Sequence, residues 1–376
     1  METNNQKNDQ NIIPNDADKQ QKGVNVPNLR FSQFVGNWVK VNIKDILKIL
    51  YGKDYKDQGA GNIPVYGTGG IMCYINNYLC NWNCVCIGRK GTINKPIYID
   101  QPFWCVDTLF YSKAKNDNSP KFQYYLFQTI NWDKLNEASG VPSLSSSTIE
   151  NIKIFIPNTD EQKRIADFLS LIDQRIDTQS KIIEKYKSLI NTIRTNIFNS
   201  FQGKWTKLCN LVENKSLQLN RGNIIPKHPK DNVYKYPVYS SSVQKDGLMG
   251  YSDYYMFDKE LITWSIDGGG DIFFREKHKF CVTNVCGILQ LDTNKFSYRF
   301  VAEALKYQHS KMTFDYQTKA HPSVVEKLYS LPDIELNEQN KYSKLFELLY
   351  SKLSNEQKCL EIIKEQKKYL LSNMFI

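Results

Sequence analysis

The chain has 376 residues, 41% of them hydrophobic and 13% aromatic, and a formal net charge of +10. This length suits two domains with enough apolar material for packed cores. There is no apolar run of about 18 residues and no signal-peptide core, so we expect a soluble, cytoplasmic protein rather than a membrane or secreted one. The lysine excess favours a polyanionic partner, although it is also common on solvated surfaces.

Residues 1–23 are nearly all Asn, Gln, Asp and Lys, and cannot bury enough apolar surface to offset the entropy of ordering. We predict a disordered leader there. The nine cysteines occur without a secretion signal, which favours reduced thiols. Cys80, Cys84 and Cys86 lack the spacing of a usual zinc pair, so we interpret them as buried thiols rather than metal ligands.

Residues 24–158 predict a first mixed α/β domain. "CVCIG" and "IYI" predict strands around a "GRKGT" turn, and "SPKFQYYLFQTI" predicts a helix.

Residues 159–200 predict one long helix, because no Pro or Gly occurs before Gly203. About 40 helical residues span about 60 Å. Thr159 and Gln162 form a possible capping box at its start. Alternating steps of four and three define a seam typical of a coiled coil. Its positions are Ile165, Leu169, Ile172, Ile176, Gln179, Ile183, Tyr186, Ile190, Ile193 and Ile197.

The second half repeats the landmarks of the first in the same order, which indicates a tandem duplication. "GNWVKVNIKDIL" is echoed by "GKWTKLCNLVEN", "IPVYGTGGIMCYINN" by "YPVYSSSVQKDGLMGYSD", and "FWCVDTLFY" by "KFCVTNVCGIL". We therefore predict a second mixed α/β domain over 201–336 and a second long helix over 337–376, with Asn337 as its N-cap.

The second helix carries the same seam in the same register, 177 residues later. Its positions are Tyr342, Phe346, Leu349, Leu353, Glu356, Leu360, Ile363, Lys367, Leu370 and Met374. Two such helices at equivalent points of a duplication pack most simply as an antiparallel coiled coil. Gln179 and Glu356 occupy matching positions, where a polar residue sets register at a cost in stability.

The motifs of common enzyme classes are missing from the sequence. "YGTGG" lacks the G-x-G-x-x-G spacing, the "GGG" at 268–270 has no Lys-Ser or Lys-Thr after it, and neither H-E-x-x-H nor G-x-S-x-G occurs. The halves share landmarks of fold and differ in their polar loops. This pattern favours two copies of a binding scaffold with different specificities, without catalytic residues or a metal site.

Together these features resemble the specificity subunit of type I restriction–modification systems. "VPNLRFSQFVGNW" is similar to the leader before a first target-recognition domain, and "SLSSSTIENIKIFIPNTDEQKRIADFLSLID" is similar to the junction that opens the conserved helix. The resemblance covers residues 24–376. The second junction keeps Glu338 and Gln339 but has Tyr342 and Ser343 in place of the Ile-Ala pair of the first.

The resemblance implies two target-recognition domains that each read half of a bipartite double-stranded DNA target, with the helices setting the spacer. It also implies two modification subunits that methylate adenine with S-adenosylmethionine. Restriction subunits that use ATP and Mg²⁺ would join them. The chain itself would bind no cofactor and carry out no chemistry.

Readout of bases needs hydrogen-bonding side chains on loops, with cations on phosphates. In the first domain we expect Arg89 to pair with guanine and Lys90 to contact phosphate. The alternatives are a solvated loop or, for the serines, a local turn cap. The candidates there are Tyr66, Thr68, Arg89, Lys90, Lys95, Ser143, Ser145 and Ser146.

In the second domain the candidates are Ser240, Ser241, Ser242, Lys245, Arg275, Lys277, Lys319 and His321. The "SIDGGGD" tip has Asp267 and Asp271 where the first domain has two cations. A carboxylate accepts from cytosine but repels phosphate, so we predict different half-sites and an asymmetric target.

Two other readings remain open. The chain could serve a different or modification-only defence complex as its DNA-specificity factor. It could instead be a coiled-coil adaptor for proteins, which explains the helices but not the basic charge or the duplicated loop-bearing domains. Salt-dependent DNA binding separates the adaptor from the others.

Overall fold

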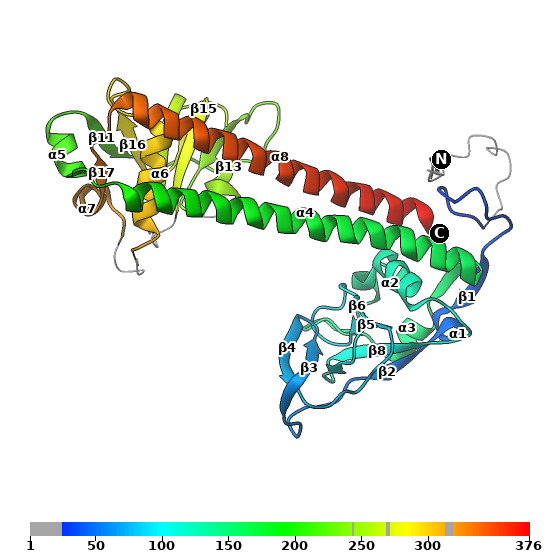
Figure 1. Ribbon diagram of the computed structural model, residues 1–376. Coiled ribbons are helices and arrows are strands. Elements are labelled where there is room, and N and C mark those ends of the chain that lie inside the picture. Colours follow the sequence, from blue (N-terminus) through cyan, green and yellow to red (C-terminus); the bar gives the residue numbers. More distant parts are fainter. Residues whose placement is uncertain (1–24, 243, 268–270, 313–318) are drawn as a thin grey trace, which may run out of the picture. The chain divides into compact units, whose positions relative to one another are not determined.

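The computed structural model describes residues 25–242, 244–267, 271–312 and 319–376 (Figure 1). The predicted leader and the glycines at 268–270 lie outside these ranges. The chain forms two compact units, the first comprising residues 1–180 with 359–376 and the second comprising residues 181–358. None of the described helices is long and apolar enough to cross a membrane.

The first unit contains two main sheets with short helices around them. One sheet has the order β2-β8-β5-β6 and the other the order β4-β3-β7. Their strands are β2 (Leu47–Tyr51), β3 (Ala60–Gly67), β4 (Gly70–Ile75), β5 (Cys84–Gly88), β6 (Ile97–Ile99), β7 (Trp104–Cys105) and β8 (Leu109–Ala114). A separate pair joins β1 (Val39–Asn42) to β9 (Lys153–Ile156), and the helices are α1 (Ile43–Ile46), α2 (Pro120–Thr129), η1 (Trp132–Leu135) and α3 (Ser146–Glu150).

The second unit builds one six-stranded sheet in the order β11-β16-β14-β15-β12-β13. Its strands are β11 (Leu217–Arg221), β12 (Tyr236–Tyr239), β13 (Leu248–Ser252), β14 (Phe257–Ser265), β15 (Ile272–Val282) and β16 (Cys286–Leu291). A separate pair joins β10 (Trp205–Lys207) to β17 (Ser330–Pro332), and the helices are α5 (Leu208–Glu213), η2 (Gln244–Gly247), α6 (Tyr298–His309) and α7 (Pro322–Leu328).

The two units share one topology, so the predicted duplication is confirmed. Val65 of β3 lies opposite Trp104 in a parallel pair, and Val238 of β12 lies opposite Cys281 in the same arrangement. The long strand β15 corresponds to the two short strands β6 and β7, and Pro102 lies in the interruption between them. Proline has no N–H to give to a ladder, which accounts for two sheets in one unit and one in the other.

The two long helices are α4 (Thr159–Ser200) and α8 (Leu336–Met374). In the first unit Asp173 Oδ1 lies 2.6 Å from Lys367 Nζ, and in the second unit Arg194 donates to the Tyr350 hydroxyl at 3.0 Å. Partner numbers fall along α8 as they rise along α4, so the predicted antiparallel pairing is confirmed. All seam positions of both helices are buried or half-buried.

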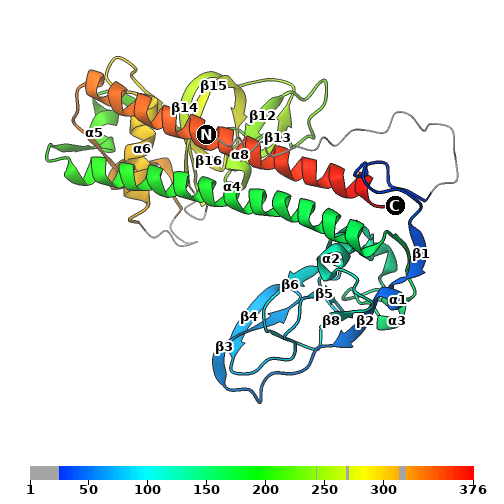
Figure 2. The ribbon, with the colours of Figure 1, turned by 45° about the vertical axis from the view of Figure 1, so that its right-hand side comes forward.

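Each unit has its own core, built where a short helix meets the start or end of the long ones. In the first unit Phe122 of α2 and Ile165 of α4 share a cluster with Met374 of α8. Figure 2 shows α2 beside the N-terminal part of α4. In the second unit Val301 of α6 packs with Phe198 of α4. The apolar faces recur at helical spacing, as the pattern predicted.

The starts of the long helices differ from the predicted caps. The side chain of Asn158 accepts from the Glu161 N–H at 2.9 Å, so the cap precedes Thr159. In the second copy the N–H groups of Glu338 and Gln339 bond to the carbonyl of Glu335. Asn337 therefore lies inside the first turn, and both cap predictions were wrong.

Gln162 makes no capping box because its side chain is used elsewhere. Its Oε1 accepts from the Ser119 N–H at 3.1 Å, and its Nε2 donates to the Pro157 carbonyl at 3.1 Å. Gln339 repeats this, accepting from the Ser297 N–H at 3.0 Å and donating to the Ile334 carbonyl at 2.8 Å. The glutamine of each Glu-Gln pair thus ties the start of a domain helix to the start of a long helix.

The glutamates of the two pairs differ. Glu161 is buried and accepts from Arg30 Nε and Nη2, at 2.7 Å each. Glu338 forms an exposed pair with Lys341 at 2.8 Å. The leader-like segment containing Arg30 therefore gives the first junction an anchor that the second junction does not have in the described residues.

Candidate nucleic-acid interface

The loop that follows β5 is held by backbone hydrogen bonds on both sides. The N–H groups of Arg89 and Lys90 donate to the Thr108 carbonyl at 2.8 and 3.1 Å, and Leu144 donates to the Arg89 carbonyl at 2.9 Å. The strands predicted on either side of "GRKGT" do pair antiparallel, but the prediction of a tight turn between them was wrong. Residues 89–96 form a longer connection to β6, because these bonds extend the backbone past the end of the ladder.

Several predicted residues of the first unit come together at this loop. Lys90 lies opposite Ser143 in an isolated bridge. A Cβ on Gly91, whose φ is +94°, would lie 3.3 Å from Thr68 Oγ1. The hydroxyls of Tyr51 and Ser146 are 2.7 Å apart. We call the set Thr68, Arg89, Lys90, Ser143 and Ser146 the first loop cluster.

Within this cluster the side chain of Arg89 is held by contacts, whereas that of Lys90 is exposed to solvent. Arg89 is half-buried, its Nη1 donates to the Asp107 carbonyl at 3.3 Å, and its guanidinium lies 5.6 Å from the centre of the Tyr51 ring. Lys90 is exposed, as is Lys95 further along the loop. A held planar guanidinium suits bidentate pairing, and an exposed ammonium suits phosphate.

Two other candidates have local roles in the fold. Ser145 is the N-cap of α3 and accepts from the Thr148 N–H at 3.1 Å, as its turn-cap alternative predicted. Tyr66 is half-buried, with its ring 5.9 Å from Phe103 in an edge-on contact.

Glu137 fastens the serine-rich turn. Its carboxylate accepts from the Thr148 hydroxyl and, at 3.0 Å, from the Ser145 N–H, and these bonds lower the pKa of Glu137.

A lowered carboxyl pKa stabilises this turn above the ordinary glutamate pKa of about 4.3 and loses that effect as the pH falls through the lowered value. We therefore expect the amide resonance of Ser145 to titrate in a pH series followed by NMR. The midpoint should lie below the ordinary glutamate pKa of about 4.3. A midpoint at or above it would contradict the role given to Glu137, and the Glu137→Gln variant should abolish the titration.

The second unit has an equivalent loop with different chemistry. Ala320 donates to the Ile266 carbonyl at 2.9 Å, as Leu144 does to Arg89. Asp267 and Lys319 then occupy the places of Lys90 and Ser143 and form an ion pair at 3.1 Å. The acidic tip is thus neutralised by a cation from the neighbouring segment, in an exposed pair of small net energy.

Sequence reasoning missed Arg221, which sits at the end of β11 beside the predicted His321. Its Nε and Nη2 donate to the Asn284 carbonyl at 3.0 and 2.7 Å, and its Nη1 lies 3.3 Å from His321 Nε2. Arg221 is the counterpart of Tyr51, because each ends its strand and is followed by a glycine, as the repeat could have indicated. Lys277, another candidate, is exposed on β15.

Arg275 does not face solvent as a free DNA contact would. Its side chain is 4% exposed and lies between the rings of Tyr239 and Phe273, at 3.8 and 4.6 Å from their centres. Its Nη1 donates to the Asp246 carbonyl at 2.8 Å. Burial lowers the pKa of Arg275. In this conformation Arg275 supports a loop, a role that its sequence context did not reveal.

That loop carries the predicted serines of the second unit. Ser240 donates its N–H to the Gly247 carbonyl at 2.8 Å and accepts from the Thr283 hydroxyl at 3.1 Å. The Ser242 hydroxyl accepts from the Gln244 N–H at 3.1 Å. Ser241 is half-buried, whereas Ser242 and Lys245 are exposed.

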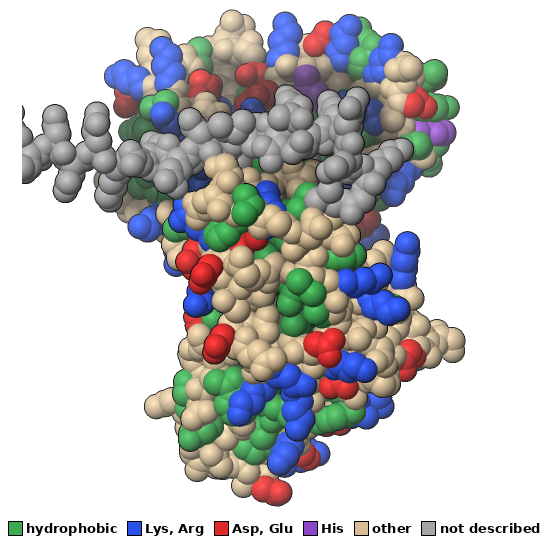
Figure 3. All heavy atoms as spheres, turned by 90° about the vertical axis from the view of Figure 1, so that its right-hand side faces the viewer, with side chains coloured by type: hydrophobic (Ala, Val, Ile, Leu, Met, Phe, Trp, Pro, Cys, Tyr) green, Lys and Arg blue, Asp and Glu red, His purple; other side chains and the backbone are tan. Residues whose placement is uncertain are grey.

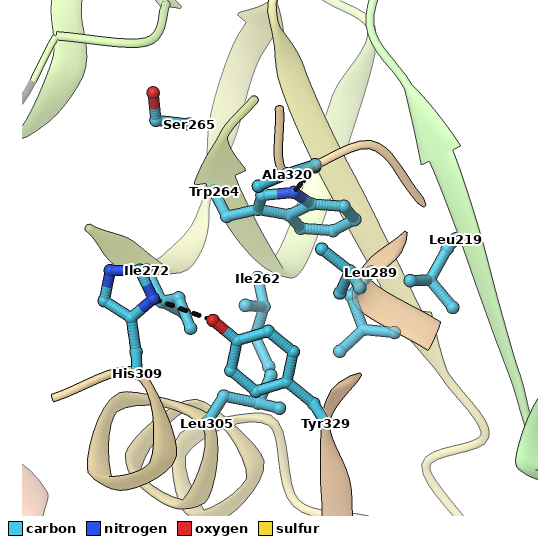
Figure 4. Close-up of a pocket in the computed structure, with 11 residues that line it drawn as sticks. Leu219, Ile262, Trp264, Ser265, Ile272, Leu289, Leu305, His309, Ala320 and Tyr329 are labelled. Atoms are coloured by element: carbon cyan, nitrogen blue, oxygen red, sulfur yellow. Dashed lines mark hydrogen bonds between the residues drawn. The ribbon is translucent and has the colours of Figure 1, made fainter. Parts of the chain in front are cut away.

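A small enclosed cavity in the second unit offers no ligand site. It measures about 10 Å³ and is lined by apolar side chains around the hydrogen bond between His309 and Tyr329, whose atoms are 2.7 Å apart (Figure 4). Burial raises the pKa of Tyr329. The space holds about one water molecule.

The thiol cluster of the first unit is a packing feature. Cys80, Cys84, Cys86 and Cys105 are buried together, with the Cys84 and Cys86 sulfurs 3.9 Å apart, and burial raises the pKa of Cys86. All nine cysteines are free thiols. The residues that the structure describes contain no group of three or more side chains arranged to hold a metal ion.

Charge is mixed on the face shown in Figure 3. Lys and Arg side chains are interspersed there with Asp and Glu.

A duplicated mixed α/β domain, with paired long helices and different polar loops on its two copies, defines a tandem recognition scaffold. The model of the type I restriction modification DNA specificity domain matches residues 36–187 and again 212–365. The chain therefore belongs to the family of type I restriction–modification specificity proteins.

Known relatives agree with this. The chain is 34% identical over 130 residues to a type I specificity subunit of Mycoplasma pneumoniae, a match that covers 32% of this chain and 42% of the relative. It is 27% identical over 225 residues to another from the same organism, covering 54% and 78%. The crystal structure of a type I S subunit from M. genitalium has a TM-score of 0.66 at 18% identity, covers 93% of this chain and 99% of that one, and establishes likeness of fold.

Proposed function

We propose that this chain is the sequence-reading subunit of a type I restriction–modification complex. It binds a bipartite double-stranded DNA target and directs adenine methylation or cleavage by partner subunits, without an active site of its own. The observation that carries the proposal is the double match to a DNA specificity domain, on two units of one topology with different loops.

The loops support an asymmetric target. The first unit presents Arg89 and Lys90 beside serine hydroxyls, whereas the second presents Arg221 and His321 beside the Asp267–Lys319 pair. Different arrays of donors and acceptors match different base edges in the major groove. The two half-sites therefore differ.

Partner subunits would dock on the long helices. In the first unit Leu171, Ile362 and Tyr369 are 62%, 55% and 63% exposed, and in the second unit Leu348 is 57% exposed. Exposed apolar side chains along helices support protein docking. Two modification subunits would supply S-adenosylmethionine chemistry there, and restriction subunits would supply ATP- and Mg²⁺-dependent cleavage.

The test is to map methylated adenines genome-wide in cells with and without this gene. We expect one bipartite, asymmetric motif that disappears with the gene. A palindromic motif would contradict the asymmetry, and a methylation pattern unchanged by deletion would contradict the function.

Arg89 and Lys90 should have separable effects. Arg89→Ala removes a planar donor pair and should relax specificity at one position of a half-site, by about 1–3 kcal/mol. Lys90→Ala should weaken binding to all sequences equally and reduce the salt slope by about 1. Binding to a panel of single-base target variants at several salt concentrations measures both. Equal loss across the panel for Arg89→Ala would exclude base readout by this side chain.

A further inference from the structure

We propose that the second unit holds a backbone-clamping site for duplex DNA, which we call the basic hollow. It lies along β13 and is lined by Lys227, His228, Pro229, Lys245, Met249 and Tyr251, with a volume of about 450 Å³. This inference rests on the proposed function and adds the chemistry by which the second unit holds the sugar–phosphate backbone beside its half-site.

The hollow forms where one segment covers the edge of the sheet. Strand β13 is the last strand of its sheet, and its Tyr251 N–H donates to the His228 carbonyl at 3.0 Å. The His228 ring stacks on Tyr234, with centroids 3.9 Å apart and planes 9° apart. The backbone bond fastens the covering segment to the sheet edge, and the stacked rings fix the conformation within the segment.

The charge on the rim suits a polyanion. Lys227 and Lys245 are exposed, and Lys230 Nζ lies 5.6 Å from the centre of the Tyr251 ring. Asp231 is turned to its own backbone, where its Oδ1 accepts from the N–H groups of Val233 and Tyr234 at 2.7 Å each. Lysine ammonium groups are the point charges that neutralise phosphates.

Contacts next to Lys245 hold Asp246 and Gly247 in place. Buried Arg275 donates to the Asp246 carbonyl, and Gly247, with φ +82°, is packed so that a Cβ would lie 2.8 Å from the Ser240 carbonyl. The same loop carries the predicted Ser240–Ser242. The hollow is thus continuous with the candidate base-reading loop, as a backbone clamp needs to be.

The apolar part of the lining favours a sugar–phosphate backbone over a free inorganic anion as the ligand. Pro229, Met249 and Tyr251 add apolar surface to the lining that holds Lys227 and Lys245. Deoxyribose carbons next to phosphates match that combination, which a small inorganic ion would leave uncovered.

The first unit has no matching charge in the corresponding segment. Residues 53–62 contain two lysines and two aspartates, with Lys56 3.8 Å from Asp54. Residues 223–235 contain three lysines and one aspartate. The second unit therefore supplies the larger sequence-independent share of the affinity in this region.

The test uses the full chain, co-purified with its modification subunits, and duplexes with and without the mapped target. The double variant Lys227→Ala/Lys245→Ala should make the slope of log affinity against log salt shallower by about 2. Its loss of affinity between about 50 and about 200 mM salt should then be about tenfold smaller than that of the unmodified complex. Target and non-target duplexes should lose affinity equally, so the methylated motif stays the same. The Lys227→Arg/Lys245→Arg variant should restore the slope.

The matched control is Lys204→Ala/Lys207→Ala, which removes two exposed lysines, one immediately before β10 and one at its last residue. A slope for the hollow variant equal to that of the control would overturn the clamp while leaving the proposed function intact. A change in target preference would also overturn it, because that is the signature of base readout. Absence of salt-dependent binding by the unmodified complex would overturn both.

Discussion

Replacing Arg194 with alanine is expected to destabilise the second unit by about 3–5 kcal/mol, because it strands a buried carboxylate. Arg194 Nε lies 2.7 Å from Glu303 Oε2, and the two side chains are 12% and 0% exposed. Burial acts to lower the pKa of Arg194, but Glu303 and Tyr350 together raise it above the usual value. The guanidinium thus stays charged and compensates Glu303.

Urea unfolding of the full chain, followed by amide hydrogen exchange within residues 181–358, would measure this loss. Lys187→Ala is the control, because its pair with Glu184 at 2.8 Å is exposed and worth about 0.2–1 kcal/mol. The apolar pair Arg194→Met/Glu303→Leu should recover most of the stability. A loss below about 1 kcal/mol for Arg194→Ala would show that the carboxylate finds water or another partner.

The first unit has a related tie made from the same three chemical groups in other positions. Tyr125 of α2 donates to Asp173 of α4 at 2.8 Å, and Lys367 of α8 completes the set. In each unit a tyrosine, an anion and a cation join a domain helix to both long helices. The tyrosine, the anion and the cation lie on different helices in the two units, so the groups of one tie would not pair with those of the other.

Gln162→Leu and Gln339→Leu should each cost about 3 kcal/mol, each in its own unit. Leucine fills the space but leaves the Ser119 or Ser297 N–H and a carbonyl without partners, at about 1–3 kcal/mol per buried group. Both glutamines are buried, at 1% exposure.

Hydrogen exchange resolved by unit would show which part loses protection. Gln162→Glu keeps the acceptor for Ser119 but turns a carboxylate oxygen towards the Pro157 carbonyl, so we expect it to cost at least as much as Gln162→Leu, because a buried charge is left unpaired. Protection lost evenly in both units would contradict the assignment of each glutamine to one junction.

Structural features that depend on the spacing of residues along the chain could be predicted from the sequence. The seam, the duplication and the position of α2 follow from periodicity and order, which depend largely on neighbours three or four residues away. The members of the first loop cluster were named from the sequence one by one, because they lie in polar loops beside predicted elements. The closure of the cluster across β5, the loop and α3 was not foreseen.

Features decided by distant partners could not be read from local pattern. Gln162 looks like a capping residue until Ser119 is placed beside it, and the sequence gives no local sign of that contact. From the sequence, Arg275 looks like an exposed cation on a strand. In the structure it packs against Tyr239 and Phe273 and supports the loop at Asp246. Arg221 went unnoticed because a lone arginine at a strand end carries no local signal.

The four buried thiols of the first unit affect whether the protein unfolds reversibly. While folded, Cys80, Cys84, Cys86 and Cys105 are shielded, and thiols with raised pKa values react slowly with oxidants. Once unfolded they are exposed within a short stretch of chain, where non-native disulfides close easily. Heating in air should therefore trap this unit irreversibly, so that its lifetime is set by its unfolding rate rather than by equilibrium stability.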